Sequence, residues 1–221
     1  MAEDRLKIWE TLFRRALVLI DSVTKAGITL SDWSFGGGTV LMRRYRHRFS
    51  KDIDIFIPDP QYLNYLSPHL NDTAERMTGD YTLQANFLKL QFTEGEIDFV
   101  VSAPLTQDRA IAETMFGREV MVETSTEIVA KKVWHRGDRF RARDIFDLSL
   151  IAEKEPAALQ SIAPVLRDRR DVILAWIDAK ESSLRDDFAN LEILEYRRSF
   201  DECLAIIREL FQRASNSSSR T

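Results

Sequence analysis

The sequence predicts an α+β protein, in which a mixed sheet flanked by helices is followed by a C-terminal helical bundle. Short segments of alternating apolar residues lie between residues 51 and 124 and are typical of strands. Apolar residues recur at helical spacing on both sides of these segments, and from about residue 156 onward the pattern is helical only. We therefore expect a core over residues 1–124, a helical domain over 125–213 and a disordered polar tail over 214–221.

The composition excludes several classes of protein. The chain has 221 residues, of which 44% are hydrophobic and 30% are charged, as in an ordinary globular protein. A net charge of −4 excludes a polycation, so binding of a polyanion requires a local basic patch. No apolar run reaches the roughly 18 residues of a membrane span, and the charged N-terminus does not resemble a signal peptide. With its single cysteine, Cys203, the chain is expected to be cytoplasmic and to bind no membrane.

The first elements are expected to be a long helix, a short strand and a second helix. Apolar residues spaced three and four apart predict a helix over residues 5–25, and Gly27 is well placed to end it. An extended segment over 29–35 leads into three consecutive glycines at 36–38, and residues 39–48 are expected to be helical.

The next segment predicts a strand that carries two aspartates. Over residues 51–58 three isoleucines alternate with polar or aromatic residues, so Asp52 and Asp54 are expected on the face opposite the isoleucines. Prolines end this strand, and residues 61–77 are expected to form short helices.

Three more strands and two helices follow in the prediction. Residues 81–92 and 96–102 are expected to be two strands joined around Glu94-Gly95, and residues 118–124 a third. Thr124 and Glu127 have the spacing of a capping box, which predicts a helix over 125–135. A basic link leads to a second helix over 142–154.

The glycines and the aspartate pair together indicate a phosphate-transfer site. Glycines 36–38 let backbone N–H groups approach phosphate oxygens, and the positive end of the following helix favours their charge. Asp52 and Asp54 share a strand face, and carboxylates are ligands that magnesium prefers. Two such ions can stabilise the attacking and leaving oxygens in phosphoryl-type transfer. Each feature alone is a weak signal, but their order and spacing make the hypothesis specific.

Asp98 is a candidate third carboxylate. Strand alternation places it on one face with Glu96 and Val100, while the intervening apolar residues face the core. It could equally be a solvated strand residue.

Basic residues gather around two segments of the chain. Charge runs are often solvated faces, but here they favour a local groove that attracts a nucleoside triphosphate and an RNA backbone. The two sets are Arg43, Arg44, Arg46, Arg48 and Lys51, and Lys131, Lys132, Arg136, Arg139, Arg141 and Arg143.

Two segments carry a resemblance to a known family. The sequences GGTVL, at 37–41, and HRFSKDIDIF, at 47–56, resemble the signature of the AbiEii/AbiGii abortive-infection toxin family. A downstream segment, EIVAKKVWHRGDRFRARDIFDL at 127–148, is similar to that family's helical lysine, arginine–aspartate pair and second aspartate. This resemblance spans about residues 33–150 and implies a DNA-polymerase-β-like nucleotidyltransferase core, with the helical domain completing the active-site cleft.

The resemblance also implies roles for particular residues. The glycine motif residues that would hold the triphosphate are Gly37, Gly38 and Thr39. The catalytic carboxylates that would bind two magnesium ions are Asp52, Asp54 and Asp98. Lys132 would contact phosphate, with Lys131 as an open alternative, and Asp144 would be a further active-site acid.

The second aspartate pair also has a structural interpretation. Asp144 and Asp147 lie three apart on one helix face and could simply pair with Arg141 or Arg143. We expect Asp147 to orient the helix rather than to take part in the reaction.

The activity implied by the resemblance is transfer of a nucleoside monophosphate from an NTP to an acceptor hydroxyl. An RNA or tRNA 3′ end is the favoured acceptor, and the family implies the toxin of a bacterial toxin–antitoxin system with a cognate antitoxin. Two alternatives stay open. The acceptor could be a small molecule or a protein hydroxyl, or the chain could be a catalytically idle nucleotide-binding module, although intact Asp52 and Asp54 argue against the latter.

Overall fold

The computed structural model describes residues 5–216 and divides the chain into two compact units. The first unit contains the residues up to Val40 together with Ser50–Ala103 and Ala110–Glu123. The second contains Leu41–Phe49, Pro104–Arg109 and the chain from Thr124 onward. Two segments that we expected in the core, 41–49 and 104–109, therefore cluster with the helical part.

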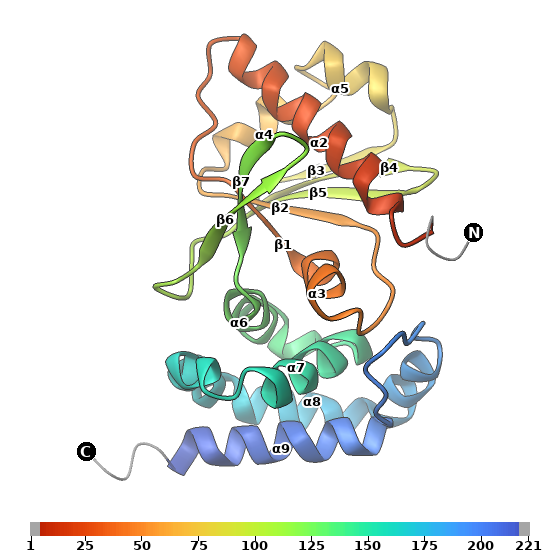
Figure 1. Ribbon diagram of the computed structural model, residues 1–221, viewed down its shortest axis with the longest axis vertical. Coiled ribbons are helices and arrows are strands. Elements are labelled where there is room, and N and C mark those ends of the chain that lie inside the picture. The colour runs from red at the N-terminus through yellow and green to blue at the C-terminus, as the bar shows by residue number, and fades with distance from the viewer. Residues whose placement is uncertain (1–4, 217–221) are drawn as a thin grey trace. The chain divides into compact units, whose positions relative to one another are not determined.

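Seven strands form one mixed sheet in the first unit, in the order β3-β4-β5-β2-β1-β7-β6 (Figure 1). The strands are β1 (Ser34–Gly36), β2 (Ile53–Ile57), β3 (Tyr81–Gln84), β4 (Phe87–Phe92), β5 (Gly95–Val101), β6 (Ala110–Met115) and β7 (Arg118–Glu123). β2 pairs antiparallel with β1 and parallel with β5, so these two strands flank it. A mixed sheet with flanking helices confirms the predicted fold class.

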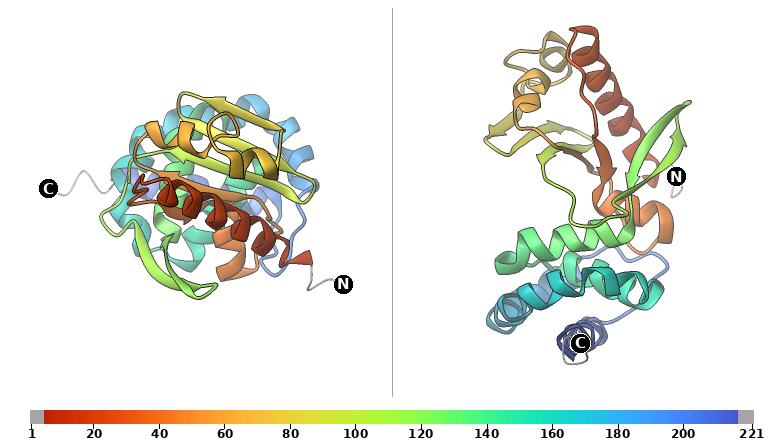
Figure 2. Two further views of the ribbon diagram at one scale, coloured as in Figure 1. Left: turned by 90° about the horizontal axis from the view of Figure 1, so that it is seen from above. Right: turned by 90° about the vertical axis from the view of Figure 1, so that its left-hand side faces the viewer.

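One face of this sheet carries the apolar core. The isoleucines of β2 are fully buried, as the alternation predicts, and so are Ile97 and Phe99 of β5. The helices of this unit are α2 (Ile8–Lys25), α4 (Gln61–Leu66) and α5 (Asp72–Met77). α2 packs against β2 and β5, α4 packs against β4, and both short helices contact α2 (Figures 1 and 2). The other face of β2 and β5 carries the acids Asp54, Glu96 and Asp98 together with Phe56 and Val100.

Glycines at two predicted positions adopt backbone conformations that other residues rarely reach. Gly27 has φ +85° and ends α2 with a hydrogen bond from its N–H to the Thr24 carbonyl. Gly37 has φ +75° and begins α3 (Gly37–Tyr45), which starts in the first unit and ends in the second. The helix ends at Tyr45, before the predicted limit of 48, because Arg46 adopts φ +48°.

The sheet contains two hairpins that the sequence did not reveal. Residues 81–92, predicted as one strand, form β3 and β4 around a turn at Ala85-Asn86, where no glycine or proline marks the break. β6 was missed because its residues are polar or exposed on both faces, so the chain shows no alternation there. β6 joins β7 through Phe116-Gly117, and both turn residues have positive φ, as a tight hairpin turn requires.

The second unit is helical. Besides the end of α3 it contains α6 (Ser125–Arg136), α7 (Ala142–Lys154), α8 (Ala163–Ala189), α9 (Phe200–Asn216) and two 3₁₀ turns, η1 (Gly137–Arg139) and η2 (Ala158–Ile162). α9 packs against α7 and α8, and α8 also contacts α6. Cys203 of α9 is buried and free, as predicted. Since α9 extends to Asn216, residues 214–216 of the predicted tail are helical, while 217–221 lie outside the described residues.

Only half of the predicted capping box forms at the start of α6. The Thr124 side chain accepts the N–H of Glu127, as predicted. The reciprocal bond was predicted wrongly, because the fully buried Glu127 carboxylate accepts the N–H groups of Leu105 and Thr106 instead. Glu127 thereby ties the segment between β5 and β6 to the helical unit.

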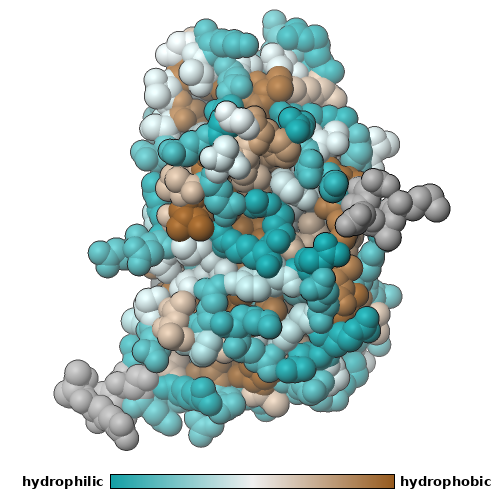
Figure 3. Space-filling view, in the orientation of Figure 1, coloured by the Kyte–Doolittle hydropathy of each residue, from teal (hydrophilic) through white to brown (hydrophobic). Residues whose placement is uncertain are grey.

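The face shown in Figure 3 is mainly hydrophilic, with apolar residues in small separate patches. Within residues 5–216, no helix is both long and apolar enough to cross a membrane.

Candidate active site

The polar face of the sheet brings two predicted carboxylates together. The parallel register of β2 and β5 pairs Asp54 directly with Asp98. Both side chains project from the face opposite the core, because Ile53, Ile55 and Ile97 point the other way and are buried. The sequence predicted this shared face, and the register adds that the two aspartates are neighbours.

The predicted glycine turn lies against the same carboxylates. β1 pairs with β2 so that Gly36 is opposite Asp54. At Gly37, a side-chain Cβ would lie 2.5 Å from the Asp54 carboxyl carbon, so only glycine fits this close approach. Gly38 is the next residue of α3, and Thr39 donates its hydroxyl to the Asp52 carbonyl at 2.6 Å. The start of α3 is therefore fixed beside the aspartate strand.

Asp98 has an electrostatic environment that disfavours its charge. Burial and the neighbouring charge of Asp54 raise the pKa of Asp98 to about 6, although Lys89 partly offsets this. Lys89 Nζ lies 3.2 Å from the carboxylate and also binds Glu96, so one ammonium serves two acids. Lys89 Nζ lies 3.2 Å from each of the two Asp98 oxygens, so a single cation faces the whole carboxylate. Lys89 therefore offsets only part of what raises the Asp98 pKa.

Asp52 is not a register partner of this pair. It lies just before β2, and its carboxylate accepts the N–H of Glu96 at 3.1 Å. Within residues 5–216, no three His, Cys, Asp or Glu side chains converge in an arrangement able to hold a metal ion.

The carboxylate pair nonetheless fits a divalent cation. Asp54 and Asp98 are adjacent hard oxygen donors, and a bound divalent cation would favour the charged form of Asp98 that burial and Asp54 disfavour. Magnesium is commonly held by one or two carboxylates together with substrate phosphates, so a third protein ligand is not required.

The predicted residues of the second unit form a buried ion network. Lys132 Nζ lies 2.7 Å from Asp144 and 3.0 Å from Asp147. Asp144 also binds Arg136 at 3.0 Å, and Asp147 is held by Arg48 through two bonds of 2.7 Å. The sequence suggested Arg141 or Arg143 as partners, which was wrong for the side chains: only the Arg141 backbone N–H reaches Asp144.

The charges of this network are mutually satisfied. Burial alone would raise the pKa of Asp144, but Lys132 and Arg136 hold it at about 2. Arg48 and Lys132 likewise hold the pKa of Asp147 well below its ordinary value despite complete burial. Lys131, the alternative to Lys132, instead lies 3.4 Å from Glu127.

Two residues near the site were not found from the sequence. Lys89 neutralises part of the Asp98 charge, and its place between two leucines on a strand was the available signal. Glu123, at the end of β7, is fully buried and accepts the hydroxyl of Ser34 at 3.0 Å. Its carboxyl carbon would lie 2.8 Å from a Cβ at Gly36, so it also explains why glycine occupies that position.

Comparison with known proteins agrees with this geometry. The sequence profile of the family described as "Nucleotidyl transferase AbiEii toxin, Type IV TA system" matches residues 28–214. No curated protein matches the chain at a significant level. Among solved structures, a protein from H. pylori classed as a nucleotidyltransferase has a TM-score of 0.54 at 16% identity, covering 95% of this chain and 94% of that one. The nucleotidyltransferase toxin MenT4 from Mycobacterium tuberculosis has a TM-score of 0.54 at 17% identity, covering 96% and 84%.

Proposed function

This chain belongs to the AbiEii nucleotidyltransferase toxin family, and from that premise we propose that it transfers a nucleoside monophosphate from an NTP to the 3′ end of an RNA. The single observation that carries the proposal is the Asp54–Asp98 pair facing a glycine-opened helix. A phosphate cradle beside two adjacent carboxylates is an arrangement suited to a magnesium–triphosphate complex.

Different residues of the first unit would bind the triphosphate and the metal ion. Backbone N–H groups of Gly37, Gly38 and Thr39 would bind the triphosphate at the positive end of α3. The predicted magnesium ligands are Asp52, Asp54 and Asp98, of which the last two are register partners. Bound magnesium would neutralise phosphate charge and stabilise the attacking and leaving oxygens. Asp54 and Asp98 would hold the ion from their paired positions on adjacent strands.

The roles proposed for Lys132 and Asp144 are compatible with their ion pairs. A lysine ammonium has three N–H donors, and two of them are directed at Asp144 and Asp147. The third is the donor that we assign to phosphate. Asp144 would then act by positioning Lys132.

The RNA acceptor is supported by a concentration of cations in the second unit. Burial, followed by the charges of Arg143 and Arg136, lowers the pKa of Arg141, and burial with Lys131 and Arg169 lowers that of His135. The contributions of the neighbouring cations show that several positive groups lie close together here, as expected of a surface for a phosphodiester backbone. Arg169 also lies 4.2 Å above the Trp134 ring, which adds an aromatic group to this basic region.

The proposal is tested by incubating the purified protein with each labelled NTP and total RNA, with and without magnesium. We expect magnesium-dependent transfer of label to RNA from at least one nucleotide. Absence of labelled RNA with all four nucleotides would contradict the proposed acceptor. As the toxin of its pair, the protein should slow bacterial growth when expressed alone, and Asp54→Ala should relieve that effect.

A further inference from the structure

Lys89 of β4 lies at one end of a row of side chains that contains the carboxylate pair. The antiparallel register of β4 and β5 pairs Lys89 with Asp98, and the parallel register of β5 and β2 pairs Asp98 with Asp54. Residues directly opposite each other on neighbouring strands point to the same face of a sheet, so these three side chains share one face. A cation of the chain itself therefore lies next to the two acids that we assign to the divalent cation.

The Lys89 ammonium is shared between Asp98 and a second acid. Its Nζ lies 3.2 Å from Oδ1 and 3.2 Å from Oδ2 of Asp98, so neither oxygen is turned away from it. Glu96 precedes Asp98 by two residues on β5 and therefore lies on the same face, where its carboxylate also accepts a hydrogen bond from Nζ. Lys89 thus has two partners on one strand.

The ammonium can move while the backbone of β4 stays fixed. Leu88 and Leu90, the neighbours of Lys89, point to the opposite face and are fully buried, so they hold the strand in place. The lysine side chain is a flexible four-carbon stem with three rotatable N–H donors, so its end can move between neighbouring acceptors. The Glu96 side chain is 36% exposed, against 26% for Lys89 and 23% for Asp98. A shift of the ammonium toward Glu96 is therefore a shift toward solvent.

A divalent cation on the carboxylate pair competes with Lys89 for Asp98. Magnesium is held through carboxylate oxygens, and both oxygens of Asp98 already face the ammonium. A lysine and a metal ion bound to the same carboxylate also repel each other, because positive charges about 4–6 Å apart disfavour one another in a partly buried site. Binding of the metal therefore requires that Lys89 give up at least part of its contact with Asp98.

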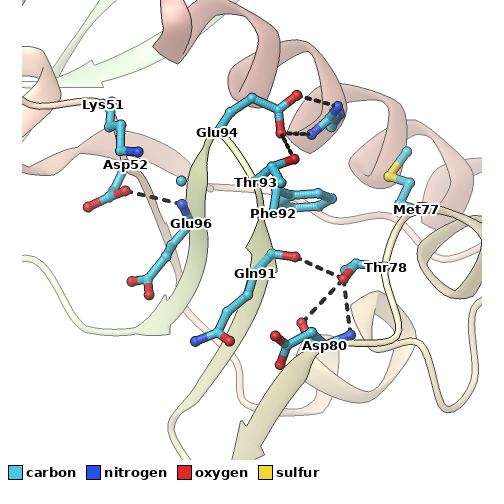
Figure 4. Close-up of a pocket in the computed structure, with 12 residues that line it drawn as sticks. Lys51, Asp52, Met77, Thr78, Asp80, Gln91, Phe92, Thr93, Glu94 and Glu96 are labelled. Carbon is cyan, nitrogen blue, oxygen red and sulfur yellow. Dashed lines mark hydrogen bonds and ion pairs between the residues drawn. The ribbon is translucent and has the colours of Figure 1, made fainter.

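Glu96 is the partner that remains for Lys89 when Asp98 binds the metal. Its carboxylate already contacts Nζ, and its backbone is held by the hydrogen bond from its N–H to Asp52 (Figure 4). Glu96 also borders a cavity of about 780 Å³, which gives the ammonium room to shift toward it (Figure 4). A partly buried cation without a counter-charge is costly, so this second carboxylate makes the exchange possible.

We propose that Lys89 is a positioning residue that holds Asp98 in the metal-free protein, competes with the divalent cation for it, and stays paired with Glu96 once the cation binds. The inference rests on the proposed function, since the cation is that of the transfer reaction, and adds the residue that limits its affinity. The oxygens of a triphosphate supply further ligands and negative charge to the cation. The competition from Lys89 therefore favours entry of the cation together with the NTP over entry of the cation alone.

The first test measures the affinity for Mn²⁺, which takes the same oxygen ligands as magnesium, by titration calorimetry at pH 8 without nucleotide. We expect Lys89→Met to bind Mn²⁺ at least about 5-fold more tightly than the wild type, because the repulsion and the competing contact are removed. Lys89→Arg, which keeps the charge, should stay within about 2-fold of the wild type. Lys25→Met is the matched control, because it removes an exposed lysine from the last turn of α2, and it should leave the affinity unchanged.

The direction of this change separates competition from a purely structural contact. If Lys89 only joined β4 to β5, Lys89→Met would lower the melting temperature and leave the Mn²⁺ affinity as in the wild type, which would overturn the proposal. Weaker Mn²⁺ binding in Lys89→Met would overturn it too, because Lys89 would then assist the metal. Lys89→Gln, a second uncharged variant, should show the same gain as Lys89→Met, and circular dichroism melts confirm that each variant is folded.

The second test repeats the Mn²⁺ titration with a saturating non-hydrolysable NTP. The factor by which the nucleotide raises the Mn²⁺ affinity should be at least about 3-fold smaller in Lys89→Met than in the wild type. In a crystal structure of the wild-type complex, Nζ should remain bonded to Glu96 and lie beyond about 4 Å from Asp98, the limit of an ion pair. An equal factor in the two proteins, or an unchanged contact between Lys89 and Asp98, would overturn the proposal.

These measurements are independent of the RNA labelling that tests the proposed transfer. If the Mn²⁺ affinity changes as predicted but no RNA is labelled with any NTP, the proposed transfer fails and the competition at Asp98 stands. If RNA is labelled while Lys89→Met and the wild type bind Mn²⁺ equally, the transfer stands and the inference about Lys89 fails.

Discussion

Two pairs of aspartates in this protein have opposite electrostatic environments. Asp144 and Asp147 are completely buried, yet their pKa values lie below the ordinary range because arginine and lysine side chains bind both carboxylates. Asp54 and Asp98 are more accessible, but the pKa of Asp98 is raised to about 6 by burial and by the charge of its neighbour. The comparison teaches that neutralisation by the chain's own cations, rather than depth of burial, separates a structural pair from one suited to a metal.

The largest expected effect lies at the Asp54–Asp98 pair. Asp54→Asn should lower nucleotidyl transfer by at least about 10³-fold, because the metal and its charge stabilisation of several kcal/mol are lost. Its thermal stability should not fall below that of the wild type, because the Asp54 charge disfavours that of its neighbour Asp98. Initial rates with labelled NTP and circular dichroism melts measure the two properties. A folded variant that kept a tenth of the activity would remove Asp54 from the reaction.

In the buried ion network of Asp144 and Asp147, by contrast, a substitution should lower the stability of the protein. Asp147→Ala leaves Arg48 and Lys132 without a shared carboxylate, so we expect a loss of about 3–5 kcal/mol in the free energy of unfolding. Urea titration measures this loss. Asp201→Ala, which removes an exposed acid paired with Arg185, is the matched control and should leave stability unchanged. If the two variants were equally stable, the claim that the network supports the fold would fail.

The smallest expected effect is on how the stability of the protein depends on pH. Asp98 has a higher pKa in the folded protein, about 6, than in the unfolded chain, near 4. Its protonated form therefore stabilises the fold fully below about pH 4, and this stabilisation is lost as the pH rises through about 6. In metal-free buffer, Asp98→Asn should therefore be more stable than the wild type at pH 8, by about 1–3 kcal/mol, and differ less at pH 4. Chemical denaturation at both values is the measurement. A variant less stable than the wild type at pH 8 would show that the Asp98 charge is well compensated.

Much of the fold follows from local sequence pattern. The alternation of isoleucines defined β2 and its polar face, and the helical spacing before Gly27 defined α2. β6 escaped because exposed side chains lie on both of its faces, Met115 alone among its residues being buried. The β3–β4 turn escaped because Asn86, a common turn residue, has no glycine or proline beside it. Local pattern thus fails where burial does not distinguish two faces of a strand.

The site was predictable in its residue types but not in its partners. Asp54 and its strand face could be read from spacing, whereas the register that pairs Asp54 with Asp98 depends on how two distant strands align. The bond between Arg48 and Asp147 joins residues 99 positions apart, so no local rule could find it. The Glu127 carboxylate likewise accepts the N–H groups of residues 105 and 106, which are distant in the sequence, and does not complete the local capping box.

Binding of Mn²⁺, a spectroscopic substitute for magnesium, tests most directly whether the Asp54–Asp98 pair is the cation site. Electron paramagnetic resonance measures free Mn²⁺ in the presence of a non-hydrolysable NTP. We predict that the wild type depletes the free-ion signal and that Asp98→Asn loses at least about 10-fold in Mn²⁺ affinity, while the exposed-acid control Glu75→Ala binds as the wild type does. Equal Mn²⁺ affinity in Asp98→Asn and the wild type would contradict the account.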